Sequence, residues 1–278
     1  MQSDVKLVKA WSGGAAKSQA NGCGHLDASL AREQGVFSRF IFEDQCTGET
    51  FTTYIEPLAG LTRHPEALCL DKNADKLGDR GYIVLGQTSE TCAHALPSRA
   101  AFRAPFARML VFDLGASTYT TPVGADSQRW FVESYARHGF AVSEYYAWEA
   151  GKHDPVAIWA EVPGDLKPHY HWLNIPATPD AESMDNPWNF LRAIATPDDF
   201  VAVKLDIDNT PVETAFMEQL FKDPKLQALV DEMFFEHHVN VENMWRYWKT
   251  QKEKVYLKDT YSMILQLRQK GIRFHSWP

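Results

Sequence analysis

The chain has 278 residues, and 45% of them are hydrophobic, which is enough apolar material for one large core or for a core domain with an extension. Charged residues make up 23%, and no stretch approaches the ~18 uninterrupted apolar residues of a membrane-spanning helix. The formal net charge is -8 and the lysines and arginines are scattered. Nucleic acid, which is bound by clustered basic residues, is therefore excluded as an expected partner.

The first third of the chain is expected to form an N-terminal extension. Residues 1–30 are polar and rich in Gly, Ala and Ser, which predicts a mobile leader, and they lack the apolar segment of a signal peptide. Residues 36–56 hold two runs rich in Phe, Ile, Thr and Tyr on either side of residues 44–48, a pattern that predicts a β-hairpin. The predicted organisation is an extension over residues 1–105 and a main domain over residues 106–278.

All four cysteines lie in the predicted extension, at Cys23, Cys46, Cys69 and Cys92. An even number confined to one region favours two disulfides, and hence the lumen of the secretory pathway or the extracellular space. The alternative is four free thiols in a cytoplasmic protein. A zinc site on these residues is less attractive, because the sequence has no C-x-x-C pair.

From residue 106 onward, strand and helix patterns alternate. Predicted strands cover 108–115, 142–148, 200–207, 233–236 and 272–275, and predicted helices cover 127–138, 188–194, 211–220 and 259–270. Strands separated by helices indicate an α/β fold with a doubly wound, mostly parallel sheet covered on both faces. Ligands of such sheets bind beyond the carboxyl ends of the strands, near the point where the strand order reverses.

The first predicted strand of this domain ends in Asp113-Leu-Gly-Ala-Ser117, and the next one ends at Glu149. A small residue such as Gly115 lets the backbone turn tightly against a bound cofactor. A carboxylate at the tip of the second strand can accept hydrogen bonds from ribose hydroxyls. The combination indicates a site for a nucleoside-bearing cofactor, whereas each part alone is also compatible with an ordinary turn.

Charged residues also follow two later strands. Lys204, Asp206 and Asp208 alternate along one strand, so they share a face at its carboxyl end. The segment Glu236-His237-His238 ends another strand, and the alternation of side chains lets only one of the two histidines join Glu236. Unpaired charges on apolar strands would be costly, so these residues are expected to meet.

Three interpretations of this second set remain open. Asp206, Asp208, Glu236 and His237 could hold a divalent metal ion, or they could form an acid–base centre. The third interpretation is a structural ion-pair network around Lys204. A separate pair, His169 and His171, falls in a predicted loop and is a weaker metal candidate.

These motifs resemble those of the FkbM-type AdoMet-dependent methyltransferases, and the resemblance covers roughly residues 109–278. It rests on five segments: Phe112-Asp-Leu-Gly-Ala116, Tyr146-Ala-Trp-Glu149, Val203-Lys-Leu-Asp-Ile-Asp208 with Glu213, Phe235-Glu-His237, and residues 267–277. The resemblance implies a Rossmann-like fold and an O-methyltransferase that acts on a hydroxyl of a small molecule or sugar.

The resemblance also implies roles for individual residues. AdoMet would lie over Asp113, Gly115, Ala116, Ser117 and Glu149. Asp206 or His237, with Lys204 beside them, would form the catalytic group that faces the acceptor. Two departures, Asp208-Asn209 in place of Glu-Gly and Ala116-Ser117 in place of further glycines, keep a second reading open. In that reading the domain is degenerate and binds a ligand, a metal or a protein partner without methyl transfer.

Overall fold

The computed structural model describes residues 5–11, 38–44, 48, 50–56, 80, 83, 85, 107–120, 127–137, 140–239 and 255–277. Contacts between residues divide the chain into two compact units. The main unit comprises Met1–Gln2 and Pro105–Tyr256, and the second unit comprises Ser3–Ala104 and Leu257–Pro278. In this division the last 22 residues group with the N-terminal part of the chain, and the predicted boundary between residues 105 and 106 stays a prediction.

The main unit is built on a parallel sheet with the strand order β6-β5-β4-β7-β8. Its strands are β4 (Met109–Leu114), β5 (Glu144–Trp148), β6 (Tyr170–Leu173), β7 (Phe200–Leu205) and β8 (Glu232–Phe235). From β4 the chain runs outward through β5 and β6 and then returns to place β7 on the other side of β4. This reversal confirms the predicted α/β fold with a doubly wound, Rossmann-like parallel sheet.

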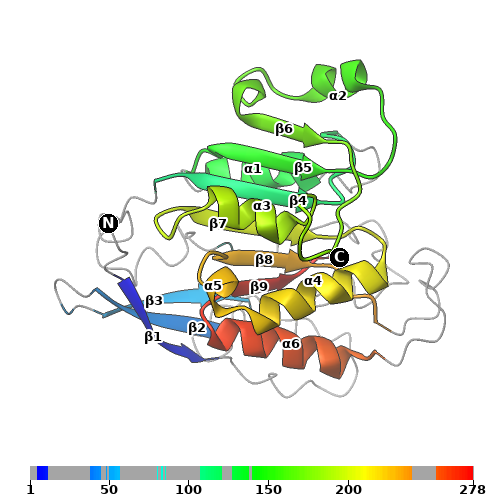
Figure 1. The fold of residues 1–278 in the computed structure, drawn as a ribbon. Helices are drawn as coiled ribbons and strands as arrows, with labels where there is room; N and C mark the ends of the chain where they lie inside the picture. Colours follow the sequence, from blue (N-terminus) through cyan, green and yellow to red (C-terminus); the bar gives the residue numbers. More distant parts are fainter. Residues whose placement is uncertain are drawn as a thin grey trace, which may run out of the picture. The chain divides into compact units, whose positions relative to one another are not determined.

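Helices cover both faces of this sheet. They are α1 (Ser127–Arg137), α2 (Pro155–Glu161), α3 (Pro187–Ile194), α4 (Thr210–Lys222) and α5 (Pro224–Gln227). In Figure 1, α1 lies behind β4 and β5, and α3 lies in front of them. Among the described residues, no helix combines the length and the apolar character needed to cross a membrane.

The two faces of the sheet are both apolar, as expected for buried parallel strands. On one face Phe112 of β4 and Trp148 of β5 contact Phe190 of α3, with ring centroids 6.5 and 5.2 Å away. On the opposite face Phe234 of β8 packs on Phe131 of α1, with centroids 4.9 Å apart. Each fully buried aromatic side chain contributes roughly 1.5–3 kcal/mol, so this double cover accounts for much of the stability of the unit.

Four of the helices begin in the same way. Before each of α2, α3, α4 and α5 an Asp or Asn side chain accepts a backbone N–H of the first turn, and a proline stands in that turn. The capping oxygen accepts a backbone N–H that has no partner within the helix. Proline has no backbone N–H, so it adds no unsatisfied donor in the first turn. The sequence therefore fixes where the helices that follow the strands begin.

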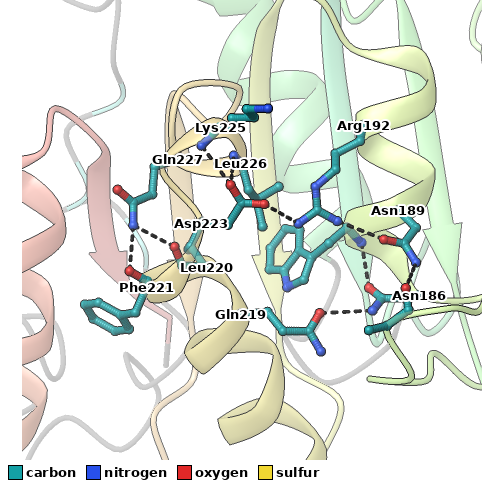
Figure 2. A network of polar contacts seen from close by, with 12 residues as sticks. Asn186, Asn189, Arg192, Gln219, Leu220, Phe221, Asp223, Lys225, Leu226 and Gln227 are labelled. Atoms are coloured by element: carbon teal, nitrogen blue, oxygen red, sulfur yellow. Dashed lines mark hydrogen bonds and ion pairs between the residues drawn. The ribbon is translucent and has the colours of Figure 1, made fainter.

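Polar contacts join α3, α4 and α5 to one another (Figure 2). Arg192 of α3 donates to Asp223 at 2.7 Å, and the same Asp223 carboxylate caps α5. Asn186, which caps α3, donates to Gln219 of α4 at 3.0 Å. These bonds connect the cap of one helix to the body of the next, so the three helices hold one another in place.

The second unit contains an antiparallel sheet of β1 (Val5–Trp11), β2 (Ser38–Asp44) and β3 (Thr50–Ile55). The pairing of β2 with β3 confirms the predicted hairpin. The prediction of a mobile leader over residues 1–30 is wrong for Val5–Trp11, because this segment pairs with β2 along its length. Its Val, Leu and Trp residues favour a strand, and composition averaged over the whole leader hid that preference.

Among its described residues, the second unit also contains α6 (Leu257–Gln269) and β9 (Arg273–Ser276), which correspond to the predicted last helix and strand. Glu56, just after β3, accepts hydrogen bonds from Arg268 of α6 at 3.1 Å, and it lies 2.5 Å from Nδ1 of His275. All three side chains are buried, so the hairpin is tied to the C-terminal segment by charged groups that compensate one another.

The four cysteines lie outside the described residues. The two disulfides, and the luminal or extracellular location that they would imply, stay predictions.

Asp231 joins the start of β8 to β7. Its carboxylate accepts the N–H of Val201 at 2.8 Å. Burial raises the pKa of Asp231 from 3.8 to about 7, although the bond from Val201 acts in the opposite direction. Between these two pH values the folded chain holds a proton that the unfolded chain has released. The free energy of unfolding therefore falls as the pH rises through this window.

We predict that Asp231→Asn removes this pH dependence. At pH 5 the variant should be more stable than the wild type by only about 1–2 kcal/mol, because its amide matches the protonated acid and can still accept the Val201 N–H. At pH 8 it should be more stable by on the order of 2–4 kcal/mol, since no charge is buried. Urea unfolding at both pH values measures the difference. Equal destabilisation at pH 5 and pH 8 would contradict the pKa assigned to Asp231.

Candidate functional site

The candidate site lies at the carboxyl edge of the main sheet, which we define as the ends of β4, β5, β7 and β8 with the residues that follow them. Asp113 of β4 is fully buried there. Ser127 and Tyr145 donate to one of its carboxylate oxygens at 2.8 and 2.7 Å, and the ammonium of Lys204 lies 3.1 Å from the other. Both carboxylate oxygens of Asp113 thus have partners within the protein, and these contacts position the end of β4.

Lys204 of β7 stands directly beside Asp113 in the sheet, and its side chain is 2% exposed. Its ammonium lies 3.1 Å from Asp113 and 3.2 Å from Asp206, and it donates to the carbonyl of Gly115 at 2.8 Å. Burial alone would lower the pKa of Lys204, but the two carboxylates raise it above its ordinary value. Lys204 is therefore held in its charged form.

Gly115 is required by the close approach of two strand ends. Its φ is +83°, and a Cβ at this position would lie 1.6 Å from the carbonyl oxygen of Asp206. A larger residue would therefore collide with backbone that cannot move aside. The tight turn expected at Gly115 is present, and the group that it approaches is the end of β7.

The next two residues continue the turn. The N–H groups of Gly115 and Ala116 both donate to the carbonyl of Trp148, at 3.0 and 2.9 Å, and Ala116 is fully buried. Ser117 has a φ of +53°, and its N–H donates to Glu149 Oε2 at 2.9 Å. Three consecutive backbone donors are thus bonded to residues at the end of β5.

Glu149 follows β5, and its side chain is partly exposed. In addition to the Ser117 N–H, it accepts the N–H of Gly151 on Oε1 at 2.5 Å. The carboxylate therefore bridges the loops that follow β4 and β5. A carboxylate oxygen has two lone pairs, so each oxygen can still accept a hydrogen bond from a ligand.

On the other half of the edge, Asp206 and Glu236 are in hydrogen-bond contact. Two carboxylates can share such a bond only when one of them is protonated. Lys204 holds the pKa of Asp206 below its ordinary value despite burial. Burial and the neighbouring Asp206 raise the pKa of Glu236 to about 7. The shared proton therefore resides on Glu236.

His238 is buried beside this pair. Its Nε2 lies 2.9 Å from Glu236, and its Nδ1 lies 2.8 Å from the Thr210 hydroxyl and 3.5 Å from Glu213. Burial acts to lower the pKa of His238, but Glu236 and Glu213 raise it above its ordinary value. Glu213 also accepts the Ile207 N–H at 2.9 Å, and burial raises its pKa to about 7.

The histidine in this cluster is His238, whereas the sequence analysis placed His237 there. The ring of His237 instead lies against Phe235, with centroids 5.4 Å apart. Residues two apart on an extended chain share a side, so the same alternation that groups Lys204 with Asp206 would have selected His238. Asp208 belongs to the cluster: one donor atom from each of Asp208, Glu236 and His238 lies within 4.8 Å of the others.

Two further members were not identified as site residues. Glu213 enters the sequence prediction only through the family motif, and no motif in the sequence points to Thr210. Both lie in the first turn of α4, which follows β7, and a helix that starts at a strand end often brings polar groups to a site. Asn209, which caps α4, indicates in the sequence that this helix begins directly after β7.

His169 and His171 lie elsewhere on the sheet. The loop predicted around them is wrong, because Tyr170–Leu173 forms β6 beside β5. Nε2 of His171 lies 2.7 Å from Glu144, and Nδ1 of His169 lies 3.8 Å from the same residue. Glu144 stands at the start of β5, so these two histidines are at the opposite end of that strand from Glu149.

Comparisons with protein-family models, with curated proteins and with solved structures find no match for this chain.

We predict that Lys204→Met destabilises the fold by roughly 3–5 kcal/mol, because it leaves Asp113 and Asp206 as neighbouring carboxylates without their buried cation. Lys222→Met is the matched control. Lys222 pairs with Glu218 at 2.8 Å on the surface, where both side chains are largely exposed, so its loss should cost well under ~1 kcal/mol. Chemical denaturation of both variants measures the difference, and similar values would contradict the proposed role of Lys204.

Proposed function

We propose that this chain is an AdoMet-dependent O-methyltransferase of the FkbM type, acting on a hydroxyl of a small molecule or sugar. The observation that carries the proposal is the position of Glu149, a partly exposed carboxylate at the tip of β5 beside the turn that ends β4. In doubly wound sheets, nucleoside-bearing cofactors bind at this crevice, and an acidic residue after the second strand accepts the ribose hydroxyls.

The residues present fit the nucleoside half of AdoMet. Glu149 would hold the ribose, because both of its oxygens keep an acceptor site beyond the bonds from Ser117 and Gly151. AdoMet supplies a sulfonium methyl group, whose transfer needs little more than in-line positioning and an acceptor oxygen that gives up its proton. The chain therefore has to orient the acceptor and receive that proton.

Asp206 and Glu236 would face the acceptor hydroxyl. Their side chains are 24% and 17% exposed, whereas that of His238 is 1% exposed. An acceptor can reach the two carboxylates, and His238 orients Glu236 from behind through Nε2. Of the two residues for which the sequence predicts a proton-accepting role, Asp206 and His237, this proposal keeps Asp206, because the proton shared with Glu236 resides on Glu236.

A second candidate is a methyltransferase-like domain that binds a ligand, a metal or a partner without methyl transfer. The observation that favours it is the occupation of the turn after β4. The N–H groups of Gly115, Ala116 and Ser117 are all bonded within the protein, and Asp113 is buried. The methionine end of AdoMet would have to find its donors elsewhere. Cofactor binding discriminates between the two candidates.

We predict that S-adenosylhomocysteine binds to the protein and raises its melting temperature. At a ligand concentration of about 100 times the dissociation constant, linkage gives ~2.7 kcal/mol of stabilisation. Glu149→Ala should weaken the affinity at least tenfold, because the ribose loses its acceptor. Thermal shift and calorimetric titration measure both effects.

Glu144→Ala is the matched control for this experiment, since Glu144 lies on the same strand at the end away from the site and pairs with His171. Its affinity should equal that of the wild type. No shift with millimolar S-adenosylhomocysteine would refute the methyltransferase proposal and favour the second candidate. Equal losses in both variants would refute the role of Glu149.

A further inference from the structure

We infer that Asp208, Glu236 and His238 bind a divalent transition-metal ion. The three residues come from the ends of two neighbouring strands, since Asp208 follows β7 and the other two follow β8. Each offers one donor atom, and these atoms lie within 4.8 Å of one another. The proposed ion would occupy the space at which a carboxylate, a second carboxylate and an imidazole converge.

The spacing of these donors suits a first-row ion. Nitrogen and oxygen ligands lie about 2.0–2.2 Å from such an ion, so two of them can be at most ~4.4 Å apart. The three donor atoms lie within 4.8 Å of one another, so they have to move by only a few tenths of an ångström to bind one ion. Asp208 is exposed, so its side chain can make that adjustment.

The types of donor narrow the choice of ion. Two carboxylates alone would also suit Mg²⁺ or Ca²⁺, which prefer oxygen ligands. An imidazole in the set favours Zn²⁺ or Fe²⁺, and Mn²⁺ suits the two carboxylates that accompany it. Three protein ligands leave at least one coordination position for water or substrate, which is the arrangement of catalytic rather than structural metal sites.

His238 is held in the way that metal-binding histidines usually are. Its Nε2 is directed toward Glu236, whereas its Nδ1 faces the Thr210 hydroxyl at 2.8 Å and the Glu213 carboxylate at 3.5 Å. Such outer partners on the second ring nitrogen fix the orientation of a ligating imidazole and increase its basicity. Thr210 and Glu213 therefore act as positioning residues for the proposed ligand.

The charge of the surroundings favours a cation at this point. The carboxylates of Asp206, Glu213 and Glu236 lie around His238, and Asp208 adds a fourth. The ammonium of Lys204 is directed at Asp113, Asp206 and the carbonyl of Gly115. A divalent ion would compensate the carboxylates at the point where they are most concentrated.

The role of the ion rests on the proposed function. An open coordination position beside Asp206 would bind the acceptor oxygen and favour its deprotonated form, as metal ions do for bound water. The substrate class would then be a hydroxyl compound that coordinates the ion. The binding of the ion itself needs no cofactor, so it can be tested separately.

The test uses the full chain, freed of metal with a chelator, and titrates it with Mn²⁺, Zn²⁺ and Mg²⁺ in calorimetric and thermal-shift experiments. We expect one ion of Mn²⁺ or Zn²⁺ per chain, bound at least tenfold more tightly than Mg²⁺. Electron paramagnetic resonance of the Mn²⁺ complex should show a bound ion.

Two variants change proposed metal ligands, and a third serves as a control. His238→Gln and Asp208→Asn should each weaken Mn²⁺ binding at least tenfold, and His237→Gln, next to the site but turned toward Phe235, should leave it unchanged. Asp208 is exposed and asparagine tolerates its φ of +53°, so Asp208→Asn tests the site even where His238→Gln fails to fold.

Failure of Mn²⁺ and Zn²⁺ to bind at millimolar concentration, or equal binding by Asp208→Asn and the wild type, would overturn the metal site. Binding of S-adenosylhomocysteine to the same variants separates the two proposals. If the protein binds S-adenosylhomocysteine but no metal ion, the proposed function stands and the metal site is refuted. If it binds the metal ion but not S-adenosylhomocysteine, only the metal site stands.

Discussion

The interaction on which the rest of the main unit depends is the buried contact of Lys204 with Asp113 and Asp206. It joins β4 to β7 where the order of the strands reverses. Burying an ion pair costs several kcal/mol in lost hydration, and attraction offsets this only when the geometry is good and the remaining donors are bonded. Here the third proton of the ammonium is directed to the Gly115 carbonyl, so the group is satisfied. The contact therefore fixes the relative position of two strand ends.

The geometry of the edge follows from this contact. Because β4 and β7 are drawn together, the turn after β4 passes so close to the Asp206 carbonyl that only glycine fits at position 115. The turn then bonds to Trp148 and Glu149 at the end of β5. On the other side, Asp206 meets Glu236 at the end of β8. One buried cation thus organises both halves of the candidate site, a carboxylate suited to a ribose and an acidic cluster that contains a histidine.

The sequence predicted the parts of the fold that depend on local pattern. The apolar runs located β4, β5, β7 and β8, and the alternation of strands and helices gave the parallel sheet. It failed for β6, because a four-residue edge strand with His171 and partly exposed residues shows no apolar run. It also failed for β1, whose partner β2 lies about 30 residues away along the chain and could not be inferred from composition.

The candidate site was predicted in outline and missed in detail for similar reasons. The grouping of Asp206, Asp208 and Glu236 followed from alternation along strands and from parallel neighbours ending at one edge. The choice between His237 and His238 depended on how the chain leaves β8. Asp208 has a left-handed backbone conformation, which the sequence pattern does not predict. The reason for Gly115 was also hidden, since the group that it approaches is more than 90 residues away.

The most direct test of the account is a crystal structure of the protein grown with S-adenosylhomocysteine. We expect electron density for the ligand at the carboxyl edge, with its ribose hydroxyls bonded to Glu149 and its sulfur facing Asp206 and Glu236. The Lys204 contacts and the Gly115 turn should stay as they are, since these groups position the site without touching the ligand. Density for the ligand anywhere else, or a ligand bound there without contact to Glu149, would contradict the proposed cofactor site.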